Sequence, residues 1–159
     1  MSDRSGSQEI WKTPLGEDRP QQVTRQGGYQ AFESADGQTL YYAKKQSGRG
    51  VWRMPASGGP ETLVSNLAWQ NLWSLTPDGL YYFDLGEEVP RVFEVPDAIP
   101  VRRIDLKSNE ITTVATIRTD LPRGAPALEV RSDGRYIAWV GRREHRSELM
   151  LVRNLHLSR

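Results

Sequence analysis

The fold is decided by the stretch FESADGQTLYYAKKQSGRGVWRMPASGGPETLV, which runs from Phe32 to Val64. It holds four short apolar or β-branched runs, and each of the first three is followed by a turn rich in polar residues and glycine. The first turn contains Asp36-Gly37, a dipeptide that accepts positive φ at low cost and closes tight hairpins. The runs TLYYA and VWRM combine aromatic and β-branched residues that favour strands. The stretch therefore predicts a four-stranded antiparallel meander.

The same turn recurs along the chain as Asp78-Gly79 and Asp133-Gly134, at intervals of 42 and 55 residues, each time before an apolar and aromatic strand. The longer interval contains GEEVPRVFEVPDAIP at 86–100, where the first repeat has only QSGRG. We interpret 86–100 as an insertion between the second and third strands. Periods near 40 residues with four strands each are typical of β-propeller blades.

The repeat divides the chain into four parts, of which the first and last are incomplete. We expect an all-β propeller fragment of about three four-stranded antiparallel blades, which a second chain could complete. Unpaired strand edges at both ends would favour such an association. The predicted parts are 1–28, a partial first blade with its third and fourth strands; 29–66, a blade; 67–117, a blade with the insertion; and 118–159, a last blade that lacks most of its fourth strand.

These turns also carry a family resemblance. Thr76-Pro77-Asp78-Gly79 before an apolar strand resembles the TolB-type β-propeller repeat, and 34–37 and 131–134 are partial versions of it. The ending SELMLV at 147–152 resembles the final strand of sensor propellers that follow winged-helix or kinase domains in some soil bacteria. The resemblance covers essentially the whole chain. It implies a propeller that binds proteins or peptides, and it transfers no catalytic residue.

Composition narrows the classes of function. The formal net charge is +1, which gives no general reason to expect nucleic-acid binding by this chain. No cysteine is present and only two histidines occur, so we expect no disulfide, no metal site and no cofactor. No apolar run is long enough for a membrane span or a signal peptide. We therefore expect a soluble, cytoplasmic chain without membrane contact, although a longer parent protein could be extracytoplasmic.

No pattern in the sequence indicates catalysis. The sequence contains no Gly-x-Ser-x-Gly nucleophile elbow, no phosphate-binding glycine loop and no clustered carboxylate pair. Peptidases of the prolyl oligopeptidase type carry propellers, but a hydrolase domain follows the propeller in those enzymes. We therefore expect no enzymatic activity.

Two groups of residues are assigned to the scaffold. The aromatic residues that recur in register are expected to pack between blades: Trp11, Trp52, Tyr42, Tyr82 and Trp139. The turn dipeptides are expected at equivalent hairpins, one per blade, where their carboxylates are too far apart to bind one metal ion: Asp36, Gly37, Asp78, Gly79, Asp133 and Gly134.

Loops on a rigid propeller are the natural place for binding. The loops between second and third strands emerge on the same face as the loops between blades, and that face is rich in cations. An ordinary solvated rim is the alternative explanation for these charges. The predicted partner-binding residues are Lys44, Lys45, Arg49, Phe93, Arg123, Arg142, Arg143, His145 and Arg146. Phe93 belongs to the apolar part of the insertion, which needs burial against its own blade, a second chain or a partner.

The sequence leaves three hypotheses for function. The first is a non-catalytic propeller module that binds an unidentified protein or peptide and self-associates, as a homo-oligomer, into a fuller propeller. The second is the sensory C-terminal portion of a bacterial transcription regulator or kinase. The third is a non-catalytic remnant of a propeller-containing hydrolase.

Overall fold

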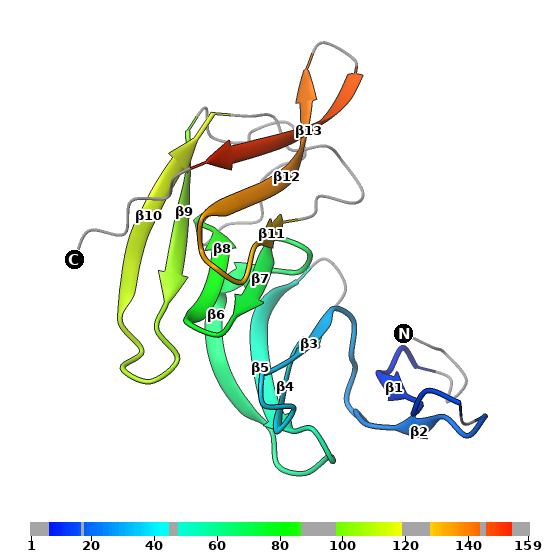
Figure 1. Cartoon of the computed structure of the whole chain (residues 1–159). Coiled ribbons are helices and arrows are strands. Elements are labelled where there is room, and N and C mark those ends of the chain that lie inside the picture. The colour runs from blue at the N-terminus through cyan, green and yellow to red at the C-terminus, as the bar shows by residue number, and fades with distance from the viewer. Residues whose placement is uncertain are drawn as a thin grey trace. The chain divides into compact units, whose positions relative to one another are not determined.

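The structure is a computed structural model of the whole chain, and it describes residues 7–16, 18–44, 48–86, 98–118, 128–143 and 146–153. From residue 142 onward the description covers the backbone alone. Every regular element in these ranges is a β-strand (Figure 1). Within the same ranges, no helix is long and apolar enough to cross a membrane. The chain divides into two compact units, Met1–Gln70 and Asn71–Arg159.

The first unit contains two antiparallel sheets, called here the first and second sheets. The first sheet pairs β1 (Trp11–Lys12) with β2 (Gln21–Gln22). The second sheet has the order β3-β4-β5-β6, so strands that follow each other in sequence are neighbours in space. Its strands are β3 (Ala31–Glu33), β4 (Thr39–Ala43), β5 (Arg49–Pro55) and β6 (Thr62–Trp69). This confirms the four-stranded antiparallel meander predicted from the stretch that begins at Phe32.

The second unit contains the third and fourth sheets. The third sheet has the order β10-β9-β8-β7, again a four-stranded antiparallel meander, and the fourth has the order β11-β12-β13. The third sheet consists of β7 (Trp73–Thr76), β8 (Gly79–Phe83), β9 (Ile99–Ile104) and β10 (Ile111–Ile117). The fourth consists of β11 (Leu128–Val130), β12 (Tyr136–Arg143) and β13 (Arg146–Arg153). The last two strands form the long hairpin that is orange to red in Figure 1.

The sheets can be compared with the four predicted parts of the chain. Each sheet begins within the part to which the sequence assigned it, but β6 continues to Trp69, three residues beyond the predicted boundary at 66. The insertion lies between β8 and β9, and Ile99 and Pro100 at its end belong to β9. Residues 87–97, including Phe93, lie outside the described residues, so the expected burial of the insertion stays a prediction.

Two of the three Asp-Gly turns share one geometry. The amide of Gly37 donates to the carbonyl of Ser34, and the amide of Gly134 donates to the carbonyl of Arg131, each at 2.8 Å. Both glycines have φ of 68°, a left-handed conformation that favours glycine. The Asp-Gly pairing predicted this feature of both turns.

The turn at Asp78-Gly79 differs from the other two. Thr76 pairs directly with Gly79, so only Pro77 and Asp78 connect β7 to β8. Gly79 is therefore a strand residue, and it is not among the glycines with positive φ. A Cβ atom at this position would lie 2.6 Å from the carbonyl oxygen of Ile104 on β9. This glycine is needed for close strand packing. Three equivalent turns were expected from the sequence, and this expectation is wrong for the turn at Asp78-Gly79.

Strand alternation places the core of the first unit between its two sheets. Ile10 and Val23 flank the first sheet, and they pack against Leu40, Tyr42 and Met54 of the second. Ala31 and Trp52 are partly buried against the same cluster. Apolar side chains thus fill the space between neighbouring sheets, as expected for sheets that pack face to face.

In the second unit the innermost strands of the two sheets lie together. The backbone amide of Val130 on β11 donates a hydrogen bond of 3.1 Å to the hydroxyl of Ser74 on β7. Leu80, Tyr82, Ile99 and Ile137 are completely buried. The second unit therefore has its own core, built from both of its sheets.

Candidate binding surfaces

The structure describes only part of the basic face predicted from the sequence. Lys44 and Arg49 are described with their side chains. Arg142, Arg143 and Arg146 are described by their backbone alone, near the tip of the β12–β13 hairpin, where residue 143 pairs with 146 and 142 with Ser147. Lys45, Phe93, Arg123 and His145 lie outside the described residues. The partner-binding role of the whole set stays a prediction.

Lys44 is engaged within its own sheet. Its ammonium group forms an ion pair with Glu61 and lies 3.9 Å from the centre of the Trp52 ring. Both side chains of the ion pair are largely buried, with 15% and 16% of their surface exposed. Glu61 also accepts a hydrogen bond from the hydroxyl of Tyr42. Lys44 is therefore held in a polar cluster of the second sheet, and its charge is not presented freely to a partner.

The cluster shifts the pKa values of its members. Burial of Glu61 would raise the pKa of its carboxyl group, but hydrogen bonds from Lys44 and Tyr42, together with the positive charge of Lys44, outweigh burial and lower it. Burial raises the pKa of Tyr42, and the neighbouring carboxylates of Glu61 and Glu9 raise it further. At neutral pH Glu61 is therefore a carboxylate and Tyr42 a neutral phenol.

A second polar network in the first unit surrounds Glu9, whose exposed fraction is 1%. Its carboxylate accepts hydrogen bonds from the hydroxyls of Ser7 and Thr24 at 2.9 and 2.6 Å, and from the amide of Gly27 at 3.2 Å. Thr24 in turn accepts a hydrogen bond of 2.9 Å from the amide of Ile10. The network ties the chain before β1 to the chain after β2. Because Thr24 and Gly27 lie 15 and 18 residues from Glu9 in the sequence, no local pattern could have identified the network.

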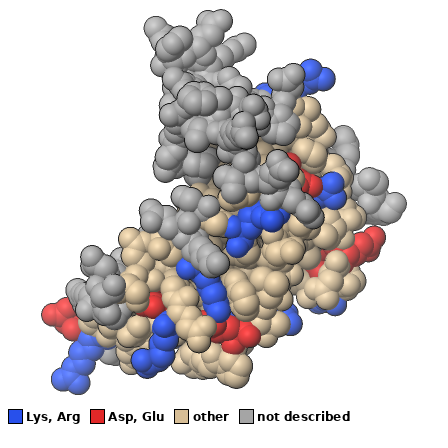
Figure 2. All heavy atoms as spheres, turned by 180° about the vertical axis from the view of Figure 1, so that it is seen from behind, with Lys and Arg blue, Asp and Glu red and all other residues tan. Residues whose placement is uncertain are grey.

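The other described residue of the basic face, Arg49, is partly buried at the start of β5. Its guanidinium carbon lies 5.7 Å from the centre of the Trp69 ring, a cation–π contact to the neighbouring strand. Figure 2 shows the Lys and Arg atoms of the described residues as separate spots with acidic and uncharged atoms between them. On the face drawn, the described residues form no continuous basic patch.

The aromatic residues assigned to packing occupy two kinds of environment. Tyr42 and Tyr82 are fully buried and Trp139 is 6% exposed, whereas Trp11 and Trp52 are partly buried. Within the described residues, the Tyr82 hydroxyl and the indole nitrogens of Trp11 and Trp139 have no hydrogen-bond partner. Burial raises the pKa of Tyr82. These side chains are buried or partly buried, and their packing between blades stays a prediction.

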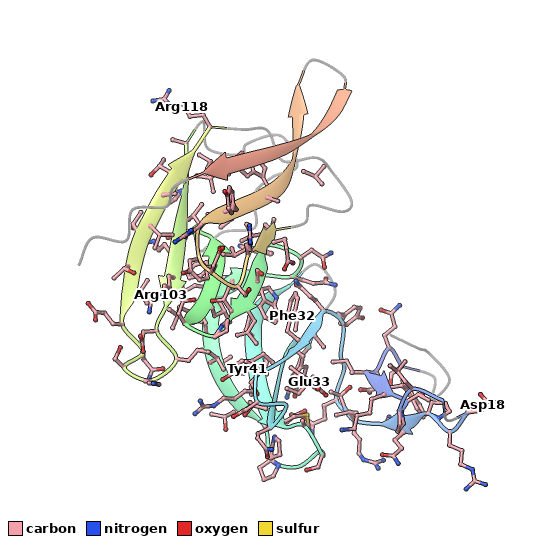
Figure 3. The ribbon with its side chains drawn as sticks, viewed as in Figure 1. Asp18, Phe32, Glu33, Tyr41, Arg103 and Arg118 are labelled. Carbon is pink, nitrogen blue, oxygen red and sulfur yellow. The ribbon has the colours of Figure 1, made fainter. Side chains whose placement is uncertain are left out.

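The turn that contains Asp78 is fixed by a local polar network. Its carboxylate accepts hydrogen bonds from Thr76 and from the Tyr81 hydroxyl, the latter at 2.9 Å. Arg103 on β9, labelled in Figure 3, donates two hydrogen bonds to the Asp78 carbonyl oxygen and pairs with Asp105 at 3.1 Å. Burial, followed by the hydrogen bond to Asp78, raises the pKa of Tyr81. These interactions explain a structural role for Asp78.

The other turn aspartates are also used locally. Asp36 accepts hydrogen bonds from the Ser34 hydroxyl and the Gln38 amide, which lower its pKa in that order of importance. Asp133 accepts from the amide of Arg135 and forms an ion pair with Arg131. In the part of the chain that the structure describes, no group of three or more His, Cys, Asp or Glu residues could hold a metal ion.

One pocket, of about 730 Å³, lies in the second unit. It is lined mainly by β11, β12 and the turn between them: Leu75, Glu129, Val130, Arg131, Ser132, Tyr136 and Ala138. None of these residues was assigned to a binding site from the sequence. The alternation of residues along β11 and β12 is the same for a packed sheet face and for an open one, so no sequence pattern signals a pocket here.

A second pocket, of about 520 Å³, lies in the first unit. It is lined by the chain after β2 and by the β5–β6 turn: Gln22, Val23, Arg25, Gln26, Met54, Ser57, Gly58, Gly59, Pro60 and Glu61. Its one carboxylate, that of Glu61, is already engaged by Lys44 and Tyr42. The carboxylate of this pocket is therefore not free to pair with a ligand.

The described architecture is similar to solved β-propellers. TolB from Acinetobacter baumannii aligns with 94% of this chain at a TM-score of 0.65 and 14% identity, over 36% of its own length. A TolB-type protein from Agrobacterium tumefaciens aligns with 87% of this chain at a TM-score of 0.54 and 20% identity, over 48% of its length. A prolyl endopeptidase aligns with 85% of this chain at a TM-score of 0.56 and 18% identity, over 23% of its length.

Sequence comparison adds no relative. No protein-family model matches the chain, and no curated protein matches it significantly. The chain spans less than half the length of each of the three structures it resembles. At identities of 14 to 20%, the likeness shows the fold alone. The chain therefore has the all-β fold of a series of β-propeller blades, as the repeated Asp-Gly turns predicted.

Proposed function

We propose that the chain is a non-catalytic β-propeller module that binds proteins or peptides and self-associates into a fuller propeller. The observation that carries the proposal is the strand order of the fourth sheet. That sheet has three described strands, and β13 (Arg146–Arg153) lies at its edge with eight residues. A long edge strand offers a row of backbone donors and acceptors to an added strand.

The incomplete first sheet supports self-association in the same way. It has only two described strands of two residues each, whereas the second and third sheets each have four. A two-stranded sheet is marginally stable without further pairing or packing. A second copy of the chain could supply strands to both incomplete sheets.

Proline substitutions along β13 test this mode of association. Neighbouring amides of an edge strand point alternately towards the paired strand and towards the open edge. Of two proline variants, at Leu149 and at Met150, one therefore removes an N–H at the open edge and the other removes an N–H bonded to β12. The test compares both variants with the wild type. We expect the variant that retains the circular dichroism of the wild type to self-associate about tenfold more weakly, as measured by sedimentation equilibrium. Val114→Pro is the matched control, because Val114 lies at a register shift in the edge strand β10 of a complete sheet.

The outcomes separate clearly. A wild-type chain that stays monomeric at the highest concentration, with a cooperative unfolding transition, would contradict self-association. Equal weakening by Val114→Pro would show that association does not depend on β13.

The basic hairpin tip is the second part of the proposal. Arg142, Arg143 and Arg146 lie close together along the backbone at the end of the β12–β13 hairpin, which places three cations in one segment. We expect Arg142→Glu combined with Arg143→Glu to abolish capture of a protein partner without changing the unfolding transition. Lys107→Glu, in the exposed β9–β10 turn, is the charge-reversal control and should leave capture unchanged.

The absence of catalysis is also proposed and can be tested directly. We expect no hydrolysis of chromogenic ester, peptide or sialoside substrates above the uncatalysed rate. Hydrolysis that is lost in a His145→Ala variant would overturn this part of the proposal and favour a hydrolase remnant.

A further inference from the structure

The starting observation is that the two faces of the fourth sheet differ. Leu128, Val130, Ile137 and Trp139 are at most 6% exposed. Glu129 and Ala138 pair with each other in the register and belong to the opposite, more accessible face. The pocket of about 730 Å³ lies along β11 and β12 and has Glu129 and Ala138 in its lining.

The lining combines apolar surface with one aromatic ring. Leu75 and Ala138 contribute aliphatic carbon, and Tyr136 contributes its ring. The volume falls within the range of roughly 300 to 1,000 Å³ that is usual for ligand pockets. It can therefore hold a long side chain together with part of the segment that carries it.

The two charged residues of the lining are not equivalent. Arg131 forms an ion pair of 3.2 Å with Asp133, and its guanidinium carbon lies 5.3 Å from the centre of the Tyr136 ring. Glu129 has no hydrogen bond or ion pair to any residue that the structure describes. Among the described residues, the positive charge of Arg131 is thus paired, and the charge that has no partner is the negative one of Glu129.

The surroundings of Glu129 support this assignment. Its side chain is exposed on the sheet face, but partial burial of the carboxyl group raises its pKa. Among the residues that the structure describes, no hydrogen bond or cation offsets that effect. A carboxylate in such a place gains from a cation that enters the pocket.

We propose that this pocket accepts a basic side chain, lysine or arginine, of a short protein segment, with Glu129 as its charge partner. The apolar lining would contact the aliphatic stem of the side chain, and the Tyr136 ring would lie beside its charged end. The proposal rests on the proposed binding function and specifies the chemistry of one partner. It concerns a different place from the basic hairpin tip, which would select acidic groups.

The test uses two end-capped peptides, Ala-Leu-Lys-Leu-Ala and Ala-Leu-Glu-Leu-Ala, titrated against the full chain by isothermal calorimetry and NMR. We expect the lysine peptide to bind at least about tenfold more tightly than the glutamate peptide. Glu129→Gln should abolish that preference, and Tyr136→Ala should weaken binding of the lysine peptide. Glu110→Gln, in the exposed β9–β10 turn, is the matched control and should have no effect.

Equal binding of the two peptides, or a preference that survives Glu129→Gln, would overturn the proposal. Weaker self-association in Glu129→Gln, without peptide binding, would identify a second copy as the occupant and would also overturn it.

Selection of binders from a random peptide library distinguishes failure of the proposed basic side-chain pocket from failure of the proposed binding function. Peptides that bind without a basic residue and independently of Glu129 would leave the binding function standing and contradict this inference. A folded chain that retains no peptide and no protein partner would contradict both.

Discussion

Glu61 and Glu129 occupy contrasting parts of the molecule, one where two sheets pack together and one on an open sheet face. Glu61 accepts hydrogen bonds from Tyr42 and Lys44, and its side chain is 16% exposed. Glu129 has no partner among the described residues and stands exposed beside a pocket. The pKa of Glu61 is lowered and that of Glu129 is raised.

The difference shows how this fold handles charge. Between the first and second sheets, apolar packing removes water, so each buried polar group needs a partner from the protein. On the open face of the fourth sheet, water can solvate an unpaired carboxylate. Charged residues that the fold leaves unpaired are the better candidates for binding. The contrast can be tested by substitutions at the enclosed, paired residues and at the open, unpaired ones.

The largest effect is expected at Glu9, the most completely enclosed carboxylate of the first unit. Glu9→Ala leaves the hydroxyl of Thr24 and the amide of Gly27 without their acceptor. We expect a loss of about 3 kcal/mol in the free energy of unfolding, measured by urea denaturation. Glu9→Gln should lose less, and Glu33→Ala, on an exposed position, should change stability by less than about 0.5 kcal/mol. Equal losses in the free energy of unfolding for Glu9→Ala and Glu33→Ala would contradict the contrast between enclosed and open carboxylates.

The contrast between enclosed and open positions extends to the turn glycines. A Cβ atom at Gly79 would lie 2.6 Å from a backbone oxygen, whereas nothing lies within 4 Å of one at Gly37. We expect Gly79→Ala to cost about 2 kcal/mol through overpacking. Gly37→Ala should cost about 1 kcal/mol, because alanine is strained at a φ of 68°. Thermal unfolding followed by circular dichroism measures both, and the reverse order would contradict the assigned roles.

Glu61→Gln tests the enclosed ion pair through its pH dependence. The folded state lowers the pKa of Glu61, so its contribution to stability is present above the ordinary value of 4.5 and is lost as the pH falls through the lowered pKa. We expect the variant to be about 1 kcal/mol less stable at pH 7, with the difference shrinking towards pH 3. Urea denaturation at several pH values measures it. A difference that does not change with pH would indicate a packing effect instead.

The smallest effect, of opposite sign, is expected at Glu129. The folded state raises its pKa, so the favourable contribution is present below 4.5 and is lost as the pH rises through the raised pKa. At pH 7 we expect Glu129→Gln to be as stable as the wild type or slightly more stable, by less than about 0.5 kcal/mol. The same denaturation series measures this effect. Destabilisation at pH 7 would show that Glu129 has a structural partner.

Local sequence predicted the scaffold because its signals are local. Alternation in TLYYA and the glycine of Asp36-Gly37 each act within a few residues, and β3 and β4 meet at that turn as predicted. The three Asp-Gly pairs looked alike in sequence, yet Gly79 is a strand residue packed against Ile104. That difference depends on a strand 25 residues away, which the turn itself does not encode.

The candidate sites were less predictable for the same reason. Lys44 was assigned to a binding face by its place in a loop, but Glu61 and Trp52 hold it within the sheet. Glu129 was not singled out, because a glutamate in an alternating strand carries no sign of whether a further sheet covers it. Which charges are paired depends on contacts between distant segments.

The sequence by itself determined the all-β architecture, the four-stranded repeat and the positions of its turns, since periodicity and turn chemistry are properties of short segments. Only the tertiary structure decided which carboxylates are enclosed and which remain open, because burial depends on the sheets that pack against each residue. For the stretch from Phe32 to Val64, the strands could be predicted from the sequence. The contacts among Tyr42, Lys44 and Glu61 could not, because they form only when the strands pair.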